Sequence, residues 1–287
     1  MRHVYECPLR WGDMDMLGHV NNVTYVDYLQ EARIDMFAAH AGFSGVQDLA
    51  EGVVVVRHEV EFVRPLVFHR APVKVAVWVT EIRAGSFTLA YEVYDDPRPG
   101  VDEARTVYLR ASSLLAPYVF ATESPRRLSA AEKEILGRFL EPAESRAAMA
   151  TEGGTRHVYP MKVRFSDVDV YRHVNNVKYF EFFQEARIGY LASLYTKGEK
   201  WSGHVVARTD VDYLAPILFR LEPYDVHSWI SHLGTRSFTI AAEIRDGDRP
   251  LARAQVVMVT FDPEAQTSAP MPAEQRVCLE RELTPPR

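Results

Sequence analysis

Residues Trp11-Gly-Asp-Met-Asp-Met-Leu-Gly-His-Val-Asn-Asn-Val-Thr-Tyr25 return later in the chain as Phe165-Ser-Asp-Val-Asp-Val-Tyr-Arg-His-Val-Asn-Asn-Val-Lys-Tyr179. They belong to a gap-free alignment of residues 9–37 with residues 163–191, in which fourteen of the twenty-nine positions are identical. Unrelated sequences of average composition would share about two, at roughly one in sixteen per position. The segment is therefore an internal repeat, and a repeat found first constrains every later prediction.

The likeness between the two halves continues downstream at an offset of 151 residues. There Arg57 pairs with Arg208, Trp78 with Trp229, and Ser86-Phe-Thr88 with Ser237-Phe-Thr239. A chain of 287 residues has room for two domains of about 140 residues, each able to bury its own core. We predict a first domain at 1–140, a surface linker at 141–155 and a second domain at 156–287.

Each half carries the same order of predicted elements. A short strand at 3–11 or 157–165 precedes a helix at 22–40 or 176–195, with Asn at the helix cap. Four strands follow, near 53–63, 72–83, 86–95 and 104–116 in the first half and near 204–214, 224–234, 237–246 and 251–262 in the second. Ser129-Ala-Ala-Glu132 is a capping box that predicts a closing helix at 129–140, with a counterpart between Pro272 and Leu283.

The two central helices carry apolar residues nearly all round, which predicts that protein surrounds them. A strand, one long enclosed helix and an antiparallel sheet that curls around it describe the α+β hot-dog fold. The sequence therefore predicts two tandem hot-dog domains.

Bulk properties exclude several classes of function. A net charge of −6 and a pI near 5.9 argue against a protein that coats nucleic acid, because that task needs clustered Lys and Arg. Cys7 and Cys278 are far apart in sequence and have no Cys/His companions, so neither a disulfide framework nor a zinc site is expected. With no signal-peptide-like start and no apolar run of bilayer length, we expect a soluble, cytoplasmic protein without a membrane span.

The repeated Asp-x-Asp-x-x-x-His-Val-Asn-Asn segment, together with the helix that follows it, resembles the 4-hydroxybenzoyl-CoA thioesterase-like hot-dog family. It is also similar to the acyl-ACP thioesterases of that superfamily, and the resemblance covers essentially both halves. It implies a tandem acyl-CoA thioesterase in which the second Asp, Asp15 or Asp169, is the general base or nucleophile. It also implies that the backbone N–H seven residues later, at Asn22 or Asn176, binds the oxyanion.

The same roles are intelligible from the residues. Thioester hydrolysis needs a base or nucleophile beside the carbonyl carbon and hydrogen-bond donors directed at the oxygen that becomes negative. A loop carboxylate supplies the first, and the free N–H groups at a helix start supply the second. The alternative for Asp15 and Asp169 is that they only cap the turn before the helix, and that role is the one we favour for Asp13 and Asp167.

Other candidates in the repeat have weaker signals. His19 and His173 could position water, protonate the leaving thiolate or orient the Asp, or could simply tie the loop to the backbone. Glu31 and Glu185 are runner-up bases, against the alternative of a solvated helix face. Substrate-binding candidates for the acyl group and the phosphates of CoA are Tyr25, Tyr179, Arg57, Arg208, Arg236 and Ser237.

The expected partner is an acyl-CoA substrate, and no cofactor, metal or nucleic acid is implied. Leu17 and Tyr171 stand where acyl-ACP thioesterases carry an Asn two residues before the His, which favours CoA over a carrier protein. A noncatalytic acyl-CoA sensor, an acyl-ACP thioesterase and a hot-dog dehydratase are the alternatives. By resemblance, the two halves form an intrachain pseudo-dimer with two pockets, and whole chains could associate further as homo-oligomers.

Overall fold

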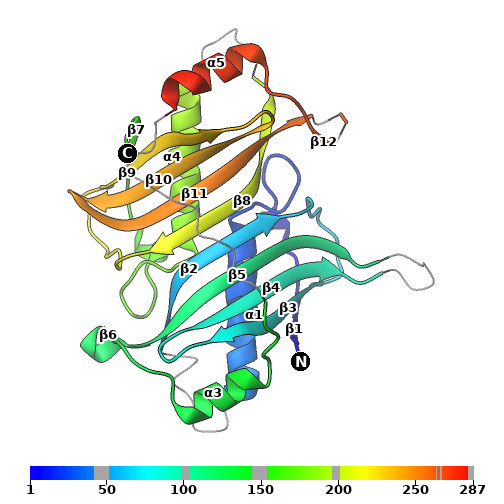
Figure 1. Ribbon diagram of the computed structural model, residues 1–287, viewed down its shortest axis with the longest axis vertical. Coiled ribbons are helices and arrows are strands. Elements are labelled where there is room, and N and C mark those ends of the chain that lie inside the picture. Colours follow the sequence, from blue (N-terminus) through cyan, green and yellow to red (C-terminus); the bar gives the residue numbers. More distant parts are fainter. Residues whose placement is uncertain are drawn as a thin grey trace. The chain divides into compact units, whose positions relative to one another are not determined.

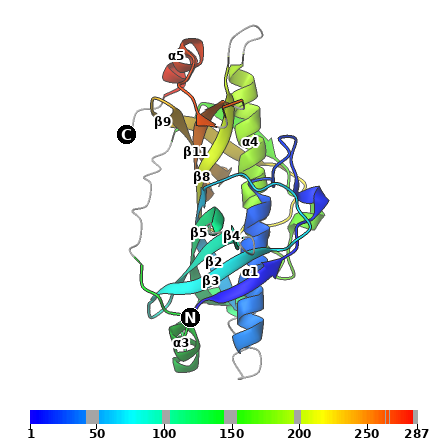
Figure 2. The same cartoon turned by 90° about the vertical axis from the view of Figure 1, so that its right-hand side faces the viewer.

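The structure is a computed structural model that describes residues 1–41, 52–97, 104–143, 154–195, 201–262, 264–265 and 267–283. The chain divides into two compact units, Met1–Ala147 and Ala148–Arg287. Most of the linker predicted at 141–155 lies outside the described residues. Each unit is a hot-dog domain of α+β class, with one long helix lying along one face of an antiparallel sheet (Figures 1 and 2).

The first unit builds its sheet in the order β1-β3-β4-β5-β2, and all neighbouring pairs are antiparallel. Its elements are β1 (His3–Cys7), the 3-10 turn η1 (Trp11–Asp13), α1 (Thr24–Ala41), β2 (Val53–Phe62), β3 (Val73–Ile82), β4 (Phe87–Asp95), β5 (Thr106–Val119), η2 (Phe120–Thr122), β6 (Ser124–Pro125) and α3 (Ala130–Gly137). The helix α3 begins at the predicted capping box, in which the Ser129 hydroxyl accepts from the Glu132 N–H and the Glu132 carboxylate accepts from the Ser129 N–H.

The second unit repeats this arrangement, with sheet order β7-β9-β10-β11-β8. Its elements are β7 (His157–Met161), η3 (Phe165–Asp167), α4 (Lys178–Leu194), β8 (Gly203–Tyr213), β9 (Tyr224–Leu233), β10 (Ser237–Asp246), β11 (Arg249–Asp262), β12 (Thr267–Ser268) and α5 (Ala273–Glu282). The helix α5 fills the place predicted for a terminal helix between Pro272 and Leu283. Its Gln275 is fully buried, and the Oε1 atom of that side chain accepts from Ser202.

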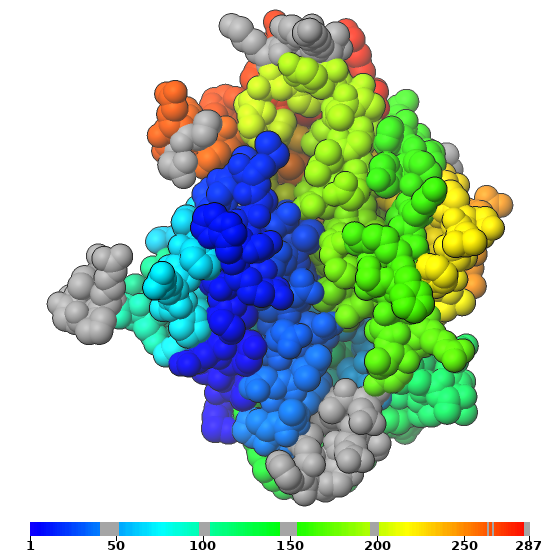
Figure 3. All heavy atoms as spheres, turned by 180° about the vertical axis from the view of Figure 1, so that it is seen from behind, coloured from blue at the N-terminus to red at the C-terminus, as the bar shows by residue number. Residues whose placement is uncertain are grey.

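The core of each unit is the layer between helix and sheet. In the first unit the ring of Phe37 on α1 contacts Phe87 on β4, and the ring of Tyr25 contacts Phe62 on β2, at centroid distances of 6.1 and 5.8 Å. The opposite side of the helix is open: Ile34 on α1 is 47% exposed, and its counterpart Ile188 on α4 is 53% exposed. Atoms of both helices reach the surface in Figure 3, so the helices are less enclosed than their apolar pattern predicted.

The closing helix α3 ends at Gly137 instead of residue 140, and β5 is shifted to Thr106–Val119 from the predicted 104–116. Two further boundaries differ from the sequence prediction at the repeated segment. The strands β1 and β7 end at Cys7 and Met161, because the chain then turns into η1 and η3 instead of continuing extended. The helices begin at Thr24 and Lys178, two residues later than predicted. None of the described helices is long and apolar enough to cross a membrane.

Candidate active site

The first Asp of each repeat is the anchor of its loop. Asp13 is buried, and its carboxylate accepts from the Arg10 backbone N–H at 2.9 Å, from Arg10 Nε at 3.0 Å and from the Tyr28 hydroxyl at 2.6 Å. Its carbonyl oxygen accepts from the Asn21 N–H at 2.8 Å. Asp13 thus joins the start of η1 to the start of α1, which is the structural role that the sequence predicted for it.

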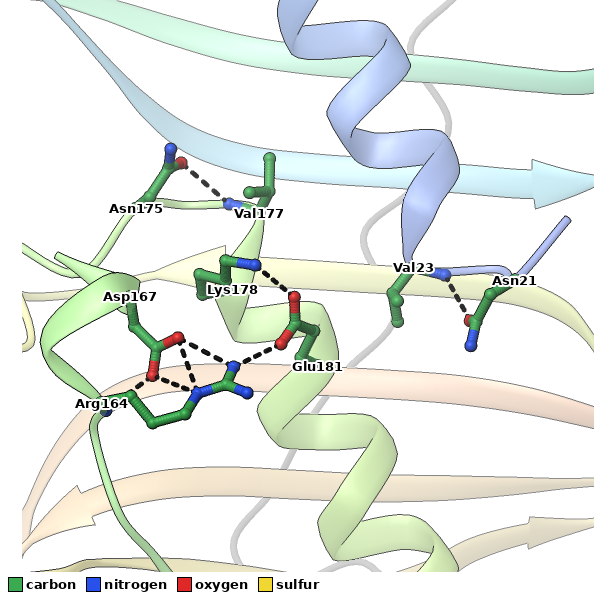
Figure 4. A network of polar contacts seen from close by, with 8 residues as sticks. All are labelled: Asn21, Val23, Arg164, Asp167, Asn175, Val177, Lys178 and Glu181. Atoms are coloured by element: carbon green, nitrogen blue, oxygen red, sulfur yellow. Dashed lines mark hydrogen bonds and ion pairs between the residues drawn. The ribbon is translucent and has the colours of Figure 1, made fainter. Parts of the chain in front are cut away.

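Asp167 holds the second loop with a different set of partners. Its carboxylate again accepts from the Arg164 backbone N–H and from Arg164 Nε, at 2.7 and 3.0 Å. Where the first unit has Tyr28, the second has Phe182, which has no hydroxyl. Instead, the Arg164 guanidinium also reaches Glu181 at 2.6 Å, and Lys178 Nζ reaches the same carboxylate at 2.5 Å (Figure 4). The second loop is therefore held by an ionic network.

The second Asp of each repeat lies in a tight, half-exposed loop. The Asp15 N–H donates to the His19 carbonyl at 2.9 Å, and the Gly18 N–H donates to the Asp15 carbonyl at 3.0 Å. One carboxylate oxygen of Asp15, Oδ1, accepts from the Leu17 N–H at 2.8 Å. Among the described residues the other oxygen, Oδ2, has no protein partner, so it can act on a bound molecule.

Asp169 repeats the same geometry. Its N–H donates to the His173 carbonyl at 2.8 Å, and its Oδ1 accepts from the Tyr171 N–H at 2.9 Å and from the His173 N–H at 3.3 Å. Arg172 adopts a left-handed φ of 66° where the first unit has Gly18 at 77°. The loop conformation is thus kept even though a non-glycine residue is disfavoured there.

The first Asn of each pair makes a turn immediately before the helix. The Asn21 side chain accepts from the Val23 N–H at 3.1 Å, and the Asn175 side chain accepts from the Val177 N–H at 3.2 Å (Figure 4). The predicted cap at Asn176 is wrong, because the N-cap residue of α4 is Val177, which makes no side-chain cap hydrogen bond. The Asn22 side chain likewise makes no cap hydrogen bond with a described residue, since it is the Asn two residues before Val23 that reaches this N–H. The Asn22 N–H makes no hydrogen bond with the described part of the chain, and the Asn176 carbonyl accepts from the Tyr213 hydroxyl at 2.9 Å.

The other repeat candidates are placed unequally. The half-buried His19 imidazole makes no hydrogen bond with any described residue, whereas His173 meets Asp169 through its backbone N–H. Glu31 and Glu185 are both on the exposed side of their helices. These two carboxylates therefore point away from the helix face that packs against the sheet.

The candidate arginines do not gather around the loops. The residues that follow Arg57 and Arg208, namely His58 and Thr209, are buried on the helix side of the sheet. Successive side chains of a strand point to opposite faces, so the two arginines are on the other face. Arg208 is held by Asp210 at 2.8 and 2.7 Å. Arg236 donates to the Ser268 carbonyl, and Ser237 is the first residue of β10. The start of α4 lies near the other end of β10, at the level of Ile244. Seven residues of strand, about 23 Å, separate Ser237 from Ile244.

The two candidate tyrosines are buried under the helix starts. Tyr25 contacts Phe62, and Tyr179 contacts Tyr213 at a centroid distance of 4.9 Å. The Tyr179 hydroxyl accepts from the Ile217 N–H at 3.2 Å, and burial raises the pKa of both tyrosines above the ordinary value of 10.0. Among the described residues, no group of three or more His, Cys, Asp or Glu side chains could hold a metal ion.

Sequence reasoning missed a pair of buried cations. Arg33 and Arg187 are equivalent positions on the central helices, and each is only 7% exposed. The signal in the sequence is the run Gln30-Glu-Ala-Arg-Ile34, which is repeated as Gln184-Glu-Ala-Arg-Ile188 and places an Arg on both central helices. Because Arg is almost never fully buried unless it is paired, an Arg among apolar neighbours on a helix that packs against a sheet is unusual.

Comparison with known proteins decides the family. The family model described as the thioesterase-like superfamily matches residues 9–139 and again residues 163–279. The chain belongs to the thioesterase-like superfamily. It is a thioester hydrolase built from two tandem copies of the domain.

Relatives support the same fold. The Bacillus subtilis protein YsmA is 32% identical over 125 residues, which is 42% of this chain and 82% of that protein. A structure from Lactobacillus plantarum, described as an oleoyl thioesterase, superposes with a TM-score of 0.72 at 17% identity, covering 91% of this thioesterase and 97% of that chain. The 12:0-ACP thioesterase from Umbellularia californica gives a TM-score of 0.67 at 17% identity, with the same coverage.

Proposed function

We propose that this thioesterase hydrolyses acyl-CoA to the free acid and CoA, with Asp15 and Asp169 as the base or nucleophile of two sites. The observation that carries the proposal is the pairing, in both units, of a half-exposed loop carboxylate with the start of the central helix. In each case Oδ1 is used to fix the loop, and Oδ2 has no partner among the described residues. The internal duplication kept this arrangement while the surrounding loop residues diverged.

The chemistry follows from these groups. As a general base, Asp15 accepts a proton from water while the water oxygen attacks the thioester carbonyl carbon. The carbonyl oxygen becomes negative, and the Asn22 N–H, at the positive end of the helix dipole, donates to it. Collapse of this intermediate breaks the C–S bond, and the CoA thiolate takes up the proton. As a nucleophile, Asp15 would instead attack the carbonyl carbon itself, breaking the C–S bond and releasing CoA thiolate; water then hydrolyses the acyl anhydride, and the thiolate takes up the proton that this releases.

The preference for CoA rests on the loop residue two positions before the His. Leu17 and Tyr171 occupy this position, and neither offers the amide that acyl-ACP thioesterases carry there. An acyl-ACP substrate is the second candidate, because two of the structures that share the fold are acyl-ACP thioesterases. Comparing acyl-CoA with the same acyl group on a carrier protein distinguishes the two.

The test replaces the two carboxylates singly and together. Asp15→Asn and Asp169→Asn keep the side-chain volume and the Oδ1 contact, so the fold should persist while the base is lost. We expect each single variant to lose a distinct part of the activity and the double variant to lose about 10²- to 10⁴-fold in kcat. Free thiol release from short-chain, long-chain and aryl-CoA esters is the assay. Wild-type turnover by the double variant would refute the mechanism.

Single-turnover hydrolysis in heavy-oxygen water separates the two roles of the Asp. A nucleophilic Asp acquires heavy oxygen when water attacks the Asp carbonyl of the anhydride, whereas an Asp that acts as a general base never acquires it; label in the Asp carboxylate therefore identifies the nucleophile. As a matched control, Asp96→Asn changes an exposed carboxylate that pairs with Lys74 on the first sheet. This variant should hydrolyse every ester at the wild-type rate.

A further inference from the structure

An exposed apolar cluster lies around the Asp-x-Asp loop of the first unit. Trp11 is 76% exposed and Met16 is 97% exposed. The Val20 N–H donates to the Leu66 carbonyl at 2.8 Å, which holds the connection between β2 and β3 against this loop, and the Trp11 ring contacts the ring of Phe68 at a centroid distance of 5.3 Å. We call the cluster the first loop patch, and its members are Trp11, Met16, Leu17, Val67 and Phe68.

The second unit repeats the cluster with different side chains. Phe165 is 84% exposed and Val170 is 89% exposed. The Val174 N–H donates to the Ile217 carbonyl at 2.9 Å, and the Phe165 ring contacts the ring of Phe219 at a centroid distance of 6.0 Å. The second loop patch consists of Phe165, Val170, Tyr171, Leu218 and Phe219, which occupy the positions equivalent to the five members of the first patch.

Apolar character is kept at these five positions although most of the residues differ. Trp stands opposite Phe, Met opposite Val, Leu opposite Tyr and Val opposite Leu, and only the last position is Phe in both patches. Exposed neighbours in the same loops are not kept in this way, since Gly12 stands opposite Ser166 and Gly18 opposite Arg172. An exposed side chain adds nothing to the core, and contiguous apolar patches of roughly several hundred Å² mark binding surfaces. The two loop patches therefore suit an apolar partner that tolerates side chains of different shapes.

Exposed cations border both patches, namely Arg64 and Arg70 beside the first and Lys162 and Arg172 beside the second. None of these four side chains makes an ion pair with a described residue. Within three positions of a patch member, Lys and Arg outnumber Asp and Glu in both units, whereas the chain as a whole carries a net charge of −6. Like charges repel, so these cations disfavour contact with the same patch of a second copy and favour an anionic partner.

We propose that each loop patch docks on the surface of a lipid bilayer that contains anionic phospholipids. A fluid layer of acyl chains accepts apolar side chains of any shape, which accounts for apolar character being kept where the residues differ. Aromatic side chains and cations are both favoured at the level of the headgroups, and each patch combines the two. Asp15 and Asp169 directly precede the patch members Met16 and Val170, so docking brings the loop carboxylates to a surface on which long-chain esters accumulate. This last consequence rests on the proposed function, whereas the docking surface does not.

The first experiment measures binding of the chain to vesicles that contain phosphatidylcholine and phosphatidylserine in equal amounts. The test variant replaces the most exposed patch members, combining Trp11→Gln, Met16→Gln, Phe165→Gln and Val170→Gln. We expect the wild type to sediment with the vesicles and the test variant to bind at least about tenfold more weakly, because burying one apolar side chain of this size contributes about tenfold in affinity. Both proteins should unfold at nearly the same temperature, since substitutions at exposed positions change stability little. No binding by the wild type overturns the proposal.

A matched control removes as many exposed apolar side chains outside the patches, by Val4→Gln, Ile34→Gln, Val158→Gln and Ile188→Gln. It should bind like the wild type, and an equal loss in the two variants overturns the proposal. Vesicles of phosphatidylcholine alone, or added salt, should weaken binding by the wild type, because the attraction to anionic headgroups is absent or screened. Equal binding to both kinds of vesicle contradicts an anionic surface. Self-association of the wild type that the test variant abolishes, without vesicle binding, makes the patches an interface between copies and also overturns the proposal.

The second experiment measures whether docking delivers substrate. The test variant should hydrolyse a long-chain acyl-CoA carried on the same vesicles about tenfold more slowly than the wild type does. A short-chain ester in solution should be hydrolysed within about twofold of the wild-type rate, because no surface is needed. If the wild type binds vesicles but hydrolyses no ester, the docking surface stands and the proposed function fails. A wild-type rate of the test variant on the vesicle-borne ester overturns the role of docking in substrate delivery.

Discussion

Replacing Tyr28 by Phe removes one hydroxyl and tests how the first Asp-x-Asp loop is held. The hydroxyl donates to Asp13 at 2.6 Å, and both residues are buried. Hydrogen bonds to charged groups contribute about 1.5–3 kcal/mol. Because Arg10 continues to donate to the carboxylate through its backbone and its guanidinium, we expect the lower part of this range, about 1.5–2 kcal/mol.

Calorimetry measures this loss. For domains of this size, 1 kcal/mol corresponds to about 2–4 °C, so the first unit of Tyr28→Phe should melt roughly 3–8 °C lower than in the wild type. The chain supplies a matched control at the equivalent position of the second unit, where Phe182→Tyr adds a hydroxyl that Asp167 does not need. That variant should gain no stability, since Asp167 is already satisfied by Arg164.

The same variant separates the two sites in activity. The Asp13 carbonyl accepts from the Asn21 N–H, so loosening Asp13 should disturb the start of α1. In an Asp169→Asn background, where only the first site works, Tyr28→Phe should lower kcat about three- to tenfold. In an Asp15→Asn background it should have no effect. An unchanged melting temperature, or an equal loss of activity in both backgrounds, would show that Tyr28 does not anchor the loop.

Three further outcomes are expected. In the Asp15→Asn variant only the second site works, and its loop is held by the half-exposed ionic network of Arg164, Glu181 and Lys178, which salt screens. The activity of this variant should therefore fall more with added salt than the activity of Asp169→Asn; equal dependence of the two activities on salt would contradict this. Arg172→Gly should stabilise the second unit by about 1 kcal/mol by relieving its left-handed conformation, with Gly18→Ala as the opposite change; a lower melting temperature for Arg172→Gly would be unexpected. Burial lowers the pKa of His204 from 6.5 to about 4, so between these values the unfolded chain binds more protons and acid destabilises the second unit. His204→Val, which installs the residue of the equivalent position Val53, should flatten that pH dependence in thermal unfolding; an unaltered profile would exclude His204 as its source.

The repeated segment contains more of the fold than any other part of the sequence. Its Asp-x-Asp turn, its Asn pair and the apolar helix that follows predicted a strand, a loop and a long helix in each half, and the family was recognisable from the same residues. These features are local: a turn, a cap and a helix depend on neighbours a few residues apart, so spacing alone reveals them.

The helix starts show where prediction from neighbouring residues becomes imprecise. Both Asn residues of a pair suit a helix start by type, and only the backbone path decides which side chain reaches an N–H; here Asn21 does, at 3.1 Å. The asymmetry between Tyr28 and Phe182 was likewise visible in the sequence as a substitution. Its meaning depends on Asp13, fifteen residues away, being brought within 2.6 Å of the hydroxyl.

The sequence by itself determined the duplication, the order of the elements, the fold class and the loop carboxylates, because periodicity and repetition are properties of the chain. Only the tertiary structure decided which polar and charged side chains are buried. Arg33 belongs to a helix and Tyr91 to a strand far along the chain, and both become buried only in the folded protein. Burial changes the energetics of an unpaired charge far more than sequence position does, so the interior arginines acquire meaning only in the folded protein.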